Sequence, residues 1–122
     1  MALSYKVMQA GLPEFLVQAG FKDVGDSLTA AGTTQGTALE LTNATNRVTT
    51  AAAGSGVILA SQGSSGDSQQ VFNAGANALK VYPPLGAKIN SLATNASMTL
   101  AVNTGCNFFC VSSTQWFGVL SA

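Results

Sequence analysis

The sequence contains no histidine and few charged residues. Of its 122 residues 8% are charged, five basic and five acidic, so the formal net charge is zero. Without histidine, zinc sites that use imidazole, Ser-His-Asp triads and Cys-His dyads are excluded within this chain. Without clusters of lysine and arginine, neither nucleic acid nor an anionic membrane surface is an expected partner, because both are bound through basic residues.

Long hydrophobic runs are also missing. No segment reaches the roughly 18 to 20 apolar residues of a membrane helix. The first residues lack the apolar stretch of a signal peptide, so we expect synthesis and folding in a cytoplasm. The chain is nevertheless 47% hydrophobic, unlike a disordered protein. Its length suits one domain with its own core, and its many Gly, Ser, Thr and Asn residues predict a nearly uncharged surface.

There are two cysteines, Cys106 and Cys110. In a strand, residues four apart are separated by about 13 Å, whereas a disulfide needs Cα atoms within about 7 Å. They could be bonded only if this segment were a helix or a turn, and a metal site would need more ligands than two thiols. We interpret both as small buried hydrophobic residues, with a redox or metal role as the alternative.

The carboxylates are too scattered to suggest paired acid–base catalysis. Glu40 lies on the polar face of a predicted strand and Asp67 in a Gly-Ser loop. Asp23 and Asp26 lie close together, which indicates an Asx-type turn or cap, because a calcium loop needs many more oxygen ligands. We predict no catalytic residue, no cofactor, no metal and no enzymatic activity.

The composition divides the chain near residue 30. We interpret residues 1–29, which are richer in charge, as an N-terminal docking arm, and residues 30–122 as the body. In the arm, Pro13 suits the start of a helix, apolar residues follow at helical spacing and Gly20 can end it. Such a short helix must dock, either on its own body or on a neighbouring subunit. The expected contact residues are Tyr5, Leu12, Phe15, Leu16 and Phe21.

Short segments with β character follow along the body at spacings near ten residues. They are alternating or β-branched runs, separated by turn residues. We predict an all-β fold, an antiparallel sandwich or barrel of about eight short strands. The most hairpin-like turns are residues 73–77 and 103–105, where Gly and Asn tolerate positive φ. The predicted strands are residues 37–42, 47–50, 56–60, 69–73, 78–82, 97–102, 106–111 and 115–120.

Four aromatic residues lie in the last two predicted strands: Phe108, Phe109, Trp116 and Phe117. We interpret them as a core cluster. The alternative is a stacking platform for a ligand. No basic residue lies near them, so nucleic acid is not expected, but glycans remain an alternative because aromatic faces and Asn side chains bind sugars without charge.

An ordered set of short motifs resembles a domain common in virion proteins of tailed phages. The most specific is Asn-Ala-Gly-Ala-Asn-Ala-Leu-Lys-Val-Tyr-Pro-Pro at residues 73–84, inside a matching stretch of residues 71–86. The resemblance extends over roughly residues 30–120. Its other motifs are residues 32–35, 48–50, 54–59, 89–90 and 110–116.

This domain occurs in head decoration (cement) proteins, head fibres and tail-fibre proteins, which are usually homotrimers. The resemblance implies a non-enzymatic structural protein of the virion. Since little besides the domain is present, it favours a decoration protein on the outer capsid surface. Such a homotrimer would bridge neighbouring major capsid protein subunits and stabilise the shell. The alternative is a tail-fibre or surface adhesin module that binds host glycans through loops such as residues 63–67 or 83–88.

Overall fold

The computed structural model describes residues 24–60 and 65–121 of the chain. In this part the regular structure is β, apart from one short 3-10 helix, η1 (Gln35–Thr37). The predicted all-β character is therefore confirmed. The predicted arm helix lies outside the described residues, and so do the five contact residues expected in the arm, Tyr5, Leu12, Phe15, Leu16 and Phe21.

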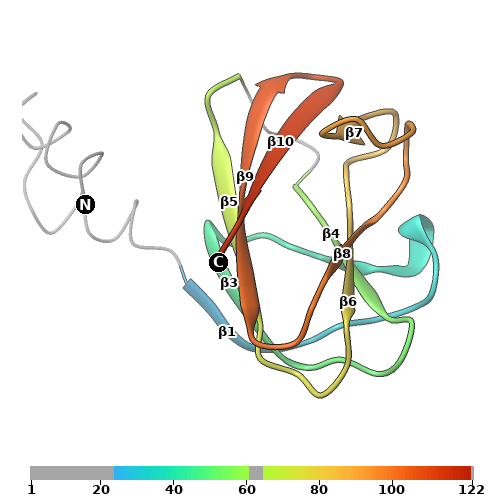
Figure 1. Ribbon diagram of the computed structural model, residues 1–122, viewed down its shortest axis with the longest axis vertical. Helices are drawn as coiled ribbons and strands as arrows, with labels where there is room; N and C mark the ends of the chain where they lie inside the picture. The colour runs from blue at the N-terminus through green and yellow to red at the C-terminus, as the bar shows by residue number, and fades with distance from the viewer. Residues whose placement is uncertain (1–23, 61–64, 122) are drawn as a thin grey trace, which may run out of the picture.

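The described residues form ten strands in two sheets that share one hydrophobic core (Figure 1). Sheet A has six strands in the order β1-β3-β5-β9-β10-β7, and sheet B has four in the order β2-β4-β6-β8. The strands are β1 (Val24–Thr29), β2 (Leu39–Glu40), β3 (Thr45–Thr50), β4 (Gly56–Ile58), β5 (Ser68–Asn73), β6 (Leu79–Tyr82), β7 (Lys88–Ile89), β8 (Met98–Leu100), β9 (Thr104–Ser112) and β10 (Gln115–Leu120).

The chain winds from one sheet to the other and back. Successive strands from β1 to β9 alternate between sheet A and sheet B, and from β1 to β4 each strand pairs with the strand two places later in the chain, after a full turn. The pairs β1–β3 and β3–β5 in sheet A and β2–β4 and β4–β6 in sheet B are all parallel. This arrangement is a β-solenoid of about four turns.

The predicted antiparallel sandwich or barrel is therefore wrong. All eight predicted segments contain strands, but consecutive strands do not pair with each other until the end of the chain. Parallel strands need a long crossover between them, and here each crossover contains a strand of the opposite sheet. Short strands with short connections are equally compatible with both arrangements, so the spacing did not distinguish them.

The direction of winding reverses in the last turn. Strand β8 runs antiparallel to β6, and β9 runs antiparallel to β5. The two strands β9 and β10 then form an antiparallel hairpin, and β10 pairs in parallel with the edge strand β7. The expected hairpins at residues 73–77 and 103–105 are wrong, because each of these segments connects one sheet to the other.

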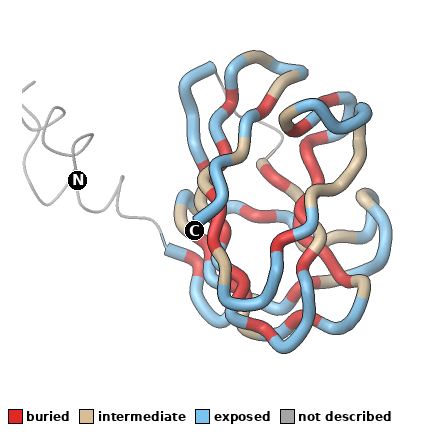
Figure 2. The backbone as a smooth tube through the Cα atoms, viewed as in Figure 1, coloured by how far each residue is buried: buried red, intermediate tan, exposed pale blue. Residues whose placement is uncertain are grey.

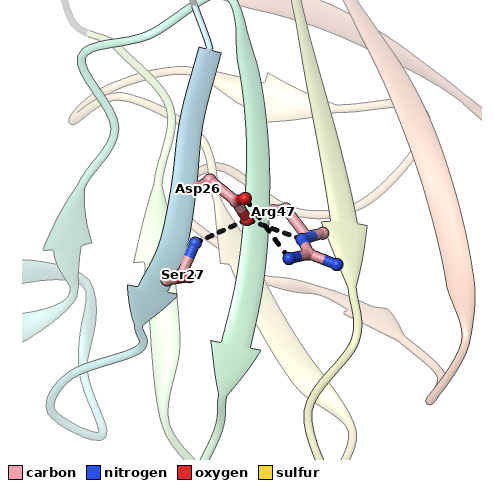
Figure 3. A network of polar contacts seen from close by, with 3 residues as sticks. All are labelled: Asp26, Ser27 and Arg47. Atoms are coloured by element: carbon pink, nitrogen blue, oxygen red, sulfur yellow. Dashed lines mark hydrogen bonds and ion pairs between the residues drawn. The ribbon is translucent and has the colours of Figure 1, made fainter.

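Strand β1 belongs to the solenoid although it lies in the range assigned to the arm. Its Asp26 pairs with Arg47 of β3, with 2.6 Å between Oδ1 and Nε and 3.2 Å between Oδ2 and Nη2 (Figure 3). Asp26 Oδ1 also accepts a hydrogen bond from the Ser27 amide at 2.7 Å. Asp26 lies inside a strand and not in the Asx-type turn or cap predicted for it, and Asp23 lies outside the described residues. The hydrogen bond from Arg47 lowers the pKa of Asp26 and keeps it ionised.

Buried and exposed residues alternate along the strands, as expected when one face of each sheet covers the core (Figure 2). In sheet B the inward side chains form a column in register, from one turn of the solenoid to the next. This column consists of Leu39, Val57, Val81 and Met98. In sheet A the large core residues are Phe108 and Trp116, which are 0% and 2% exposed.

Buried amide side chains fix the corners where the chain passes between sheets. Asn73 donates from Nδ2 to the carbonyls of Asn77 and Leu100 and accepts from the Gly75 amide, at 2.9 to 3.0 Å. Gln69 likewise donates to the carbonyl of Asn43 at 3.0 Å and accepts from the Ala60 amide at 2.9 Å. These amides replace water for buried backbone groups that have no strand partner.

The close approach of β4 and β6 requires glycine at position 56. A Cβ atom there would lie 2.8 Å from the Lys80 carbonyl oxygen and 2.9 Å from Tyr82 Cε2, so the two strands would have to separate. We expect Gly56→Ala to lower the free energy of unfolding by about 1–3 kcal/mol. The matched control is Gly36→Ala, where a Cβ would meet nothing within 4 Å. Its effect should stay within about 0.5 kcal/mol. Urea denaturation measures both, and equal effects would contradict the β4–β6 contact.

Candidate interaction surface

The outer surface of sheet A over β5, β9 and β10 is apolar. Five large side chains there are 42 to 60% exposed: Phe72, Phe109, Val111, Phe117 and Val119. We call these five residues the apolar face. The three strands contain no charged residue, and the other outward positions on them carry small or uncharged polar side chains. Adjacent, exposed apolar side chains on one sheet face are typical of a contact surface rather than of free solvent.

Strand pairing places the side chains of the apolar face next to one another. Phe117 lies directly opposite Phe109 in the antiparallel β9–β10 pair, and Val119 lies opposite Asn107. Phe72 lies opposite Gly105, and its ring occupies the space that a Cβ atom at Gly105 would need, since that atom would be 2.5 Å from the ring. The absence of a side chain at Gly105 therefore leaves room for the Phe72 ring.

A shallow hollow of about 170 Å³ lies at one end of the apolar face. Its wall includes Phe72 and Val119 together with two amide side chains, Gln70 and Asn107, which face each other in the β5–β9 pair. The hollow thus combines an aromatic ring with hydrogen-bonding amides and contains no charge.

Elsewhere the outer surface carries polar side chains together with single exposed apolar ones, among them Val24 at 63% and Leu85 at 82%. On the β1–β3 half of sheet A the outer surface carries the exposed ion pair of Asp26 and Arg47 as well as Val24. On sheet B, Glu40 and Thr99 are exposed and Lys80 is partly exposed. The apolar face lies on one half of sheet A, where three neighbouring strands contribute its five side chains.

The structure separates the four aromatic residues that the sequence grouped as a core cluster. Phe108 and Trp116 are in the core, but Phe109 and Phe117 are 42% and 47% exposed on the apolar face. Alternation is the signal that could have shown this, because adjacent residues in a strand point to opposite faces. Phe72 was missed for the same reason, since it follows the buried Val71 directly.

Both cysteines are free and buried, as interpreted from the sequence. Their side chains lie on the core side of β9, where they are 3% exposed. Burial raises the pKa of the Cys106 thiol to about 11 and also raises the pKa of Cys110. Both thiols are therefore protonated at neutral pH.

The carboxylates that the sequence offered as candidates do not lie together in one site among the described residues. Of the carboxylates in the described residues, Asp26 is bonded to Arg47, Glu40 lies on β2, and Asp67 lies in the loop before β5. Within residues 24–60 and 65–121, no three His, Cys, Asp or Glu side chains are placed to hold a metal ion. In the same part of the chain, no helix has the length and apolar character needed to cross a membrane.

The loop of residues 83–88, proposed as a glycan-binding loop, is tied to the body. Gln35 donates from Nε2 to the Pro83 carbonyl at 2.9 Å and to Asn95 Oδ1 at 3.1 Å, and the Gly86 amide donates to the same Asn95 oxygen at 2.7 Å. Leu85 at its tip is 82% exposed. The other proposed loop, residues 63–67, lies partly outside the described residues.

Comparison of the sequence with protein-family models and with curated proteins finds no match. The geometry of the chain itself is therefore the basis for a functional proposal.

The burial of the two thiols predicts their reactivity. In the folded protein at pH 8, we expect iodoacetamide to label neither Cys106 nor Cys110 on the timescale that labels both in guanidinium chloride. The thiolate is the reacting species, and a pKa of about 11 leaves Cys106 almost fully protonated. Mass spectrometry of the intact chain counts the labels. Rapid labelling of the native protein, without unfolding, would contradict the placement of these side chains.

Proposed function

We propose that this chain is a capsid decoration protein, which assembles as a homotrimer on the outer surface of a phage head and bridges neighbouring major capsid subunits. The observation that carries the proposal is the apolar face, an uncharged contact surface on a solenoid. The motif resemblance to virion proteins supplies the setting, and the contact surface supplies the reason for assembly.

A decoration protein must hold neighbouring capsid subunits together without deforming when the shell is under pressure. In the solenoid, backbone hydrogen bonds connect each turn to the next, and the core column of sheet B runs through these turns in register. Because both sheets share one core, separating two points on the surface would break many hydrogen bonds and apolar contacts together. Such a rigid body would transmit a load from one capsid subunit to the next without deforming.

The absence of net charge also suits this function. Association through apolar and amide groups depends little on ionic strength, whereas exposed ion pairs weaken in salt. A formal net charge of zero also lets many copies crowd on one shell without mutual repulsion. In this proposal the N-terminal arm adds a second contact, through Tyr5, Leu12, Phe15, Leu16 and Phe21.

Binding to heads tests the proposal directly. We expect the purified chain to bind heads that lack it, to saturate at a fixed number of copies, and to raise the temperature at which the heads release their DNA. The double variant Phe15→Ser/Leu16→Ser should weaken binding about 100-fold or more, because each buried Phe or Leu contributes about 1.5–3 kcal/mol. Gln18→Ser, a polar change in the same segment, is the control and should bind like the wild type.

Two outcomes of this experiment count against the proposal. If heads do not bind the chain at all, a decoration function is wrong. If the double variant and the Gln18→Ser control bind equally well, the arm makes no contact with the shell and drops out of the proposal.

A second candidate, a tail-fibre or adhesin module for host glycans, rests on the hollow beside Phe72. An aromatic ring next to the amides of Gln70 and Asn107 offers stacking and hydrogen bonds to an uncharged sugar. A glycan array distinguishes the two candidates, because binding to glycans without binding to heads would favour the adhesin.

A further inference from the structure

We propose that the apolar face is the surface through which copies of this chain associate with one another. This inference deepens the proposed function, because it assigns the contact between subunits of the oligomer to Phe72, Phe109, Val111, Phe117 and Val119. The occupant of the face is thus a second copy of the chain.

The size of the face matches such a contact. At 42 to 60% exposure the five side chains offer on the order of 400 Å² of apolar surface, given about 150–250 Å² for a whole aromatic side chain. A standard interface buries about 800 Å² on each partner, of which a little over half is apolar. The apolar face therefore supplies about the apolar part of one such interface, and polar neighbours such as Gln70 and Asn107 supply part of its rim.

The chemistry of the face favours an identical partner. In a homotrimer whose copies point the same face at the threefold axis, each charge on that face approaches the equal charges of the other two copies, so charged residues there oppose self-association. Strands β5, β9 and β10 contain no charged residue at all. The charged groups of sheet A lie instead on β1 and β3, in the pair of Asp26 and Arg47, and on the edge strand β7 at Lys88.

The face is also preorganised. Each of its three strands has a hydrogen-bonded neighbour on both sides, since β5 lies between β3 and β9, and β10 lies between β9 and β7. Phe and Val have few rotatable bonds, and the Phe109 and Phe117 rings already lie opposite each other. Little conformational entropy is therefore lost when a partner covers them.

The N-terminal segment of the same chain fits the face less well. It joins sheet A at the start of β1, and β3 separates β1 from the first strand of the apolar face. Residues 1–23 also carry four charged side chains, for which the three strands offer no opposite charge. These residues are Lys6, Glu14, Lys22 and Asp23.

Oligomer mass tests the inference on the full chain. By light scattering and sedimentation, we expect the wild type to have three times the 12.3 kDa of one chain. Phe117→Lys places like charges where identical faces meet, and should raise the dissociation constant of the oligomer at least 100-fold. Val119→Lys, at the more exposed end of the face, is a second variant in case the first does not fold. Thr99→Lys adds the same charge on the exposed surface of sheet B and should leave the mass unchanged.

The same proteins are then tested for binding to heads, which separates this inference from the proposed function. A monomeric wild type overturns the inference, and so does a folded Phe117→Lys or Val119→Lys variant that keeps the wild-type mass. If the lysine variants keep their mass but lose binding to heads, the face contacts the shell instead of a second copy, and the decoration function stands. If they become monomeric while Thr99→Lys does not, the inference is supported whatever the result with heads.

Discussion

The structure depends on backbone hydrogen bonds between successive turns of one chain, which place like side chains above one another in the core. The column of Leu39, Val57, Val81 and Met98 shows the result, because each member is the register partner of the next. Lateral pairing alone would leave the corners unpaired, and the amides of Gln69 and Asn73 satisfy the backbone groups there. Pairing and corner bonds together let a chain with short strands and few charges form a rigid body.

The apolar face follows from the same winding. A two-sheet solenoid needs only one face of each sheet for its core, so the outer faces are free to carry whatever an external contact requires. Over β1 and β3 that surface carries an ion pair, and over β5, β9 and β10 it carries phenylalanine and valine. The body and the contact surface are thus made by alternate residues of the same strands. Phe108 supports the core while Phe109, its neighbour in the chain, faces outward.

Much of the fold could be predicted, but its topology could not. Alternation and turn residues located eight of the ten strands in the part of the chain that the structure describes, including the central strand β9. They missed β7, which has only two residues, and β1, whose residues were grouped with the arm by composition. They also placed hairpins at residues 73–77 and 103–105, where the chain changes sheets. A connection of five residues can reverse a strand or pass to a facing sheet, and the residues of the turn do not determine which.

The all-β class, the burial of Cys106 and Cys110 and the nearly uncharged character of the chain could be predicted without the structure, because they follow from composition, from residue type and from alternation within a single strand. Tertiary structure alone decided that the strands wind as a solenoid and that Phe72, Phe109 and Phe117 share one exposed face. The physical reason is that side-chain alternation divides residues between two faces of a strand. Which of those faces is covered depends on strands that are distant in the chain. These strands come together only when the whole solenoid has formed.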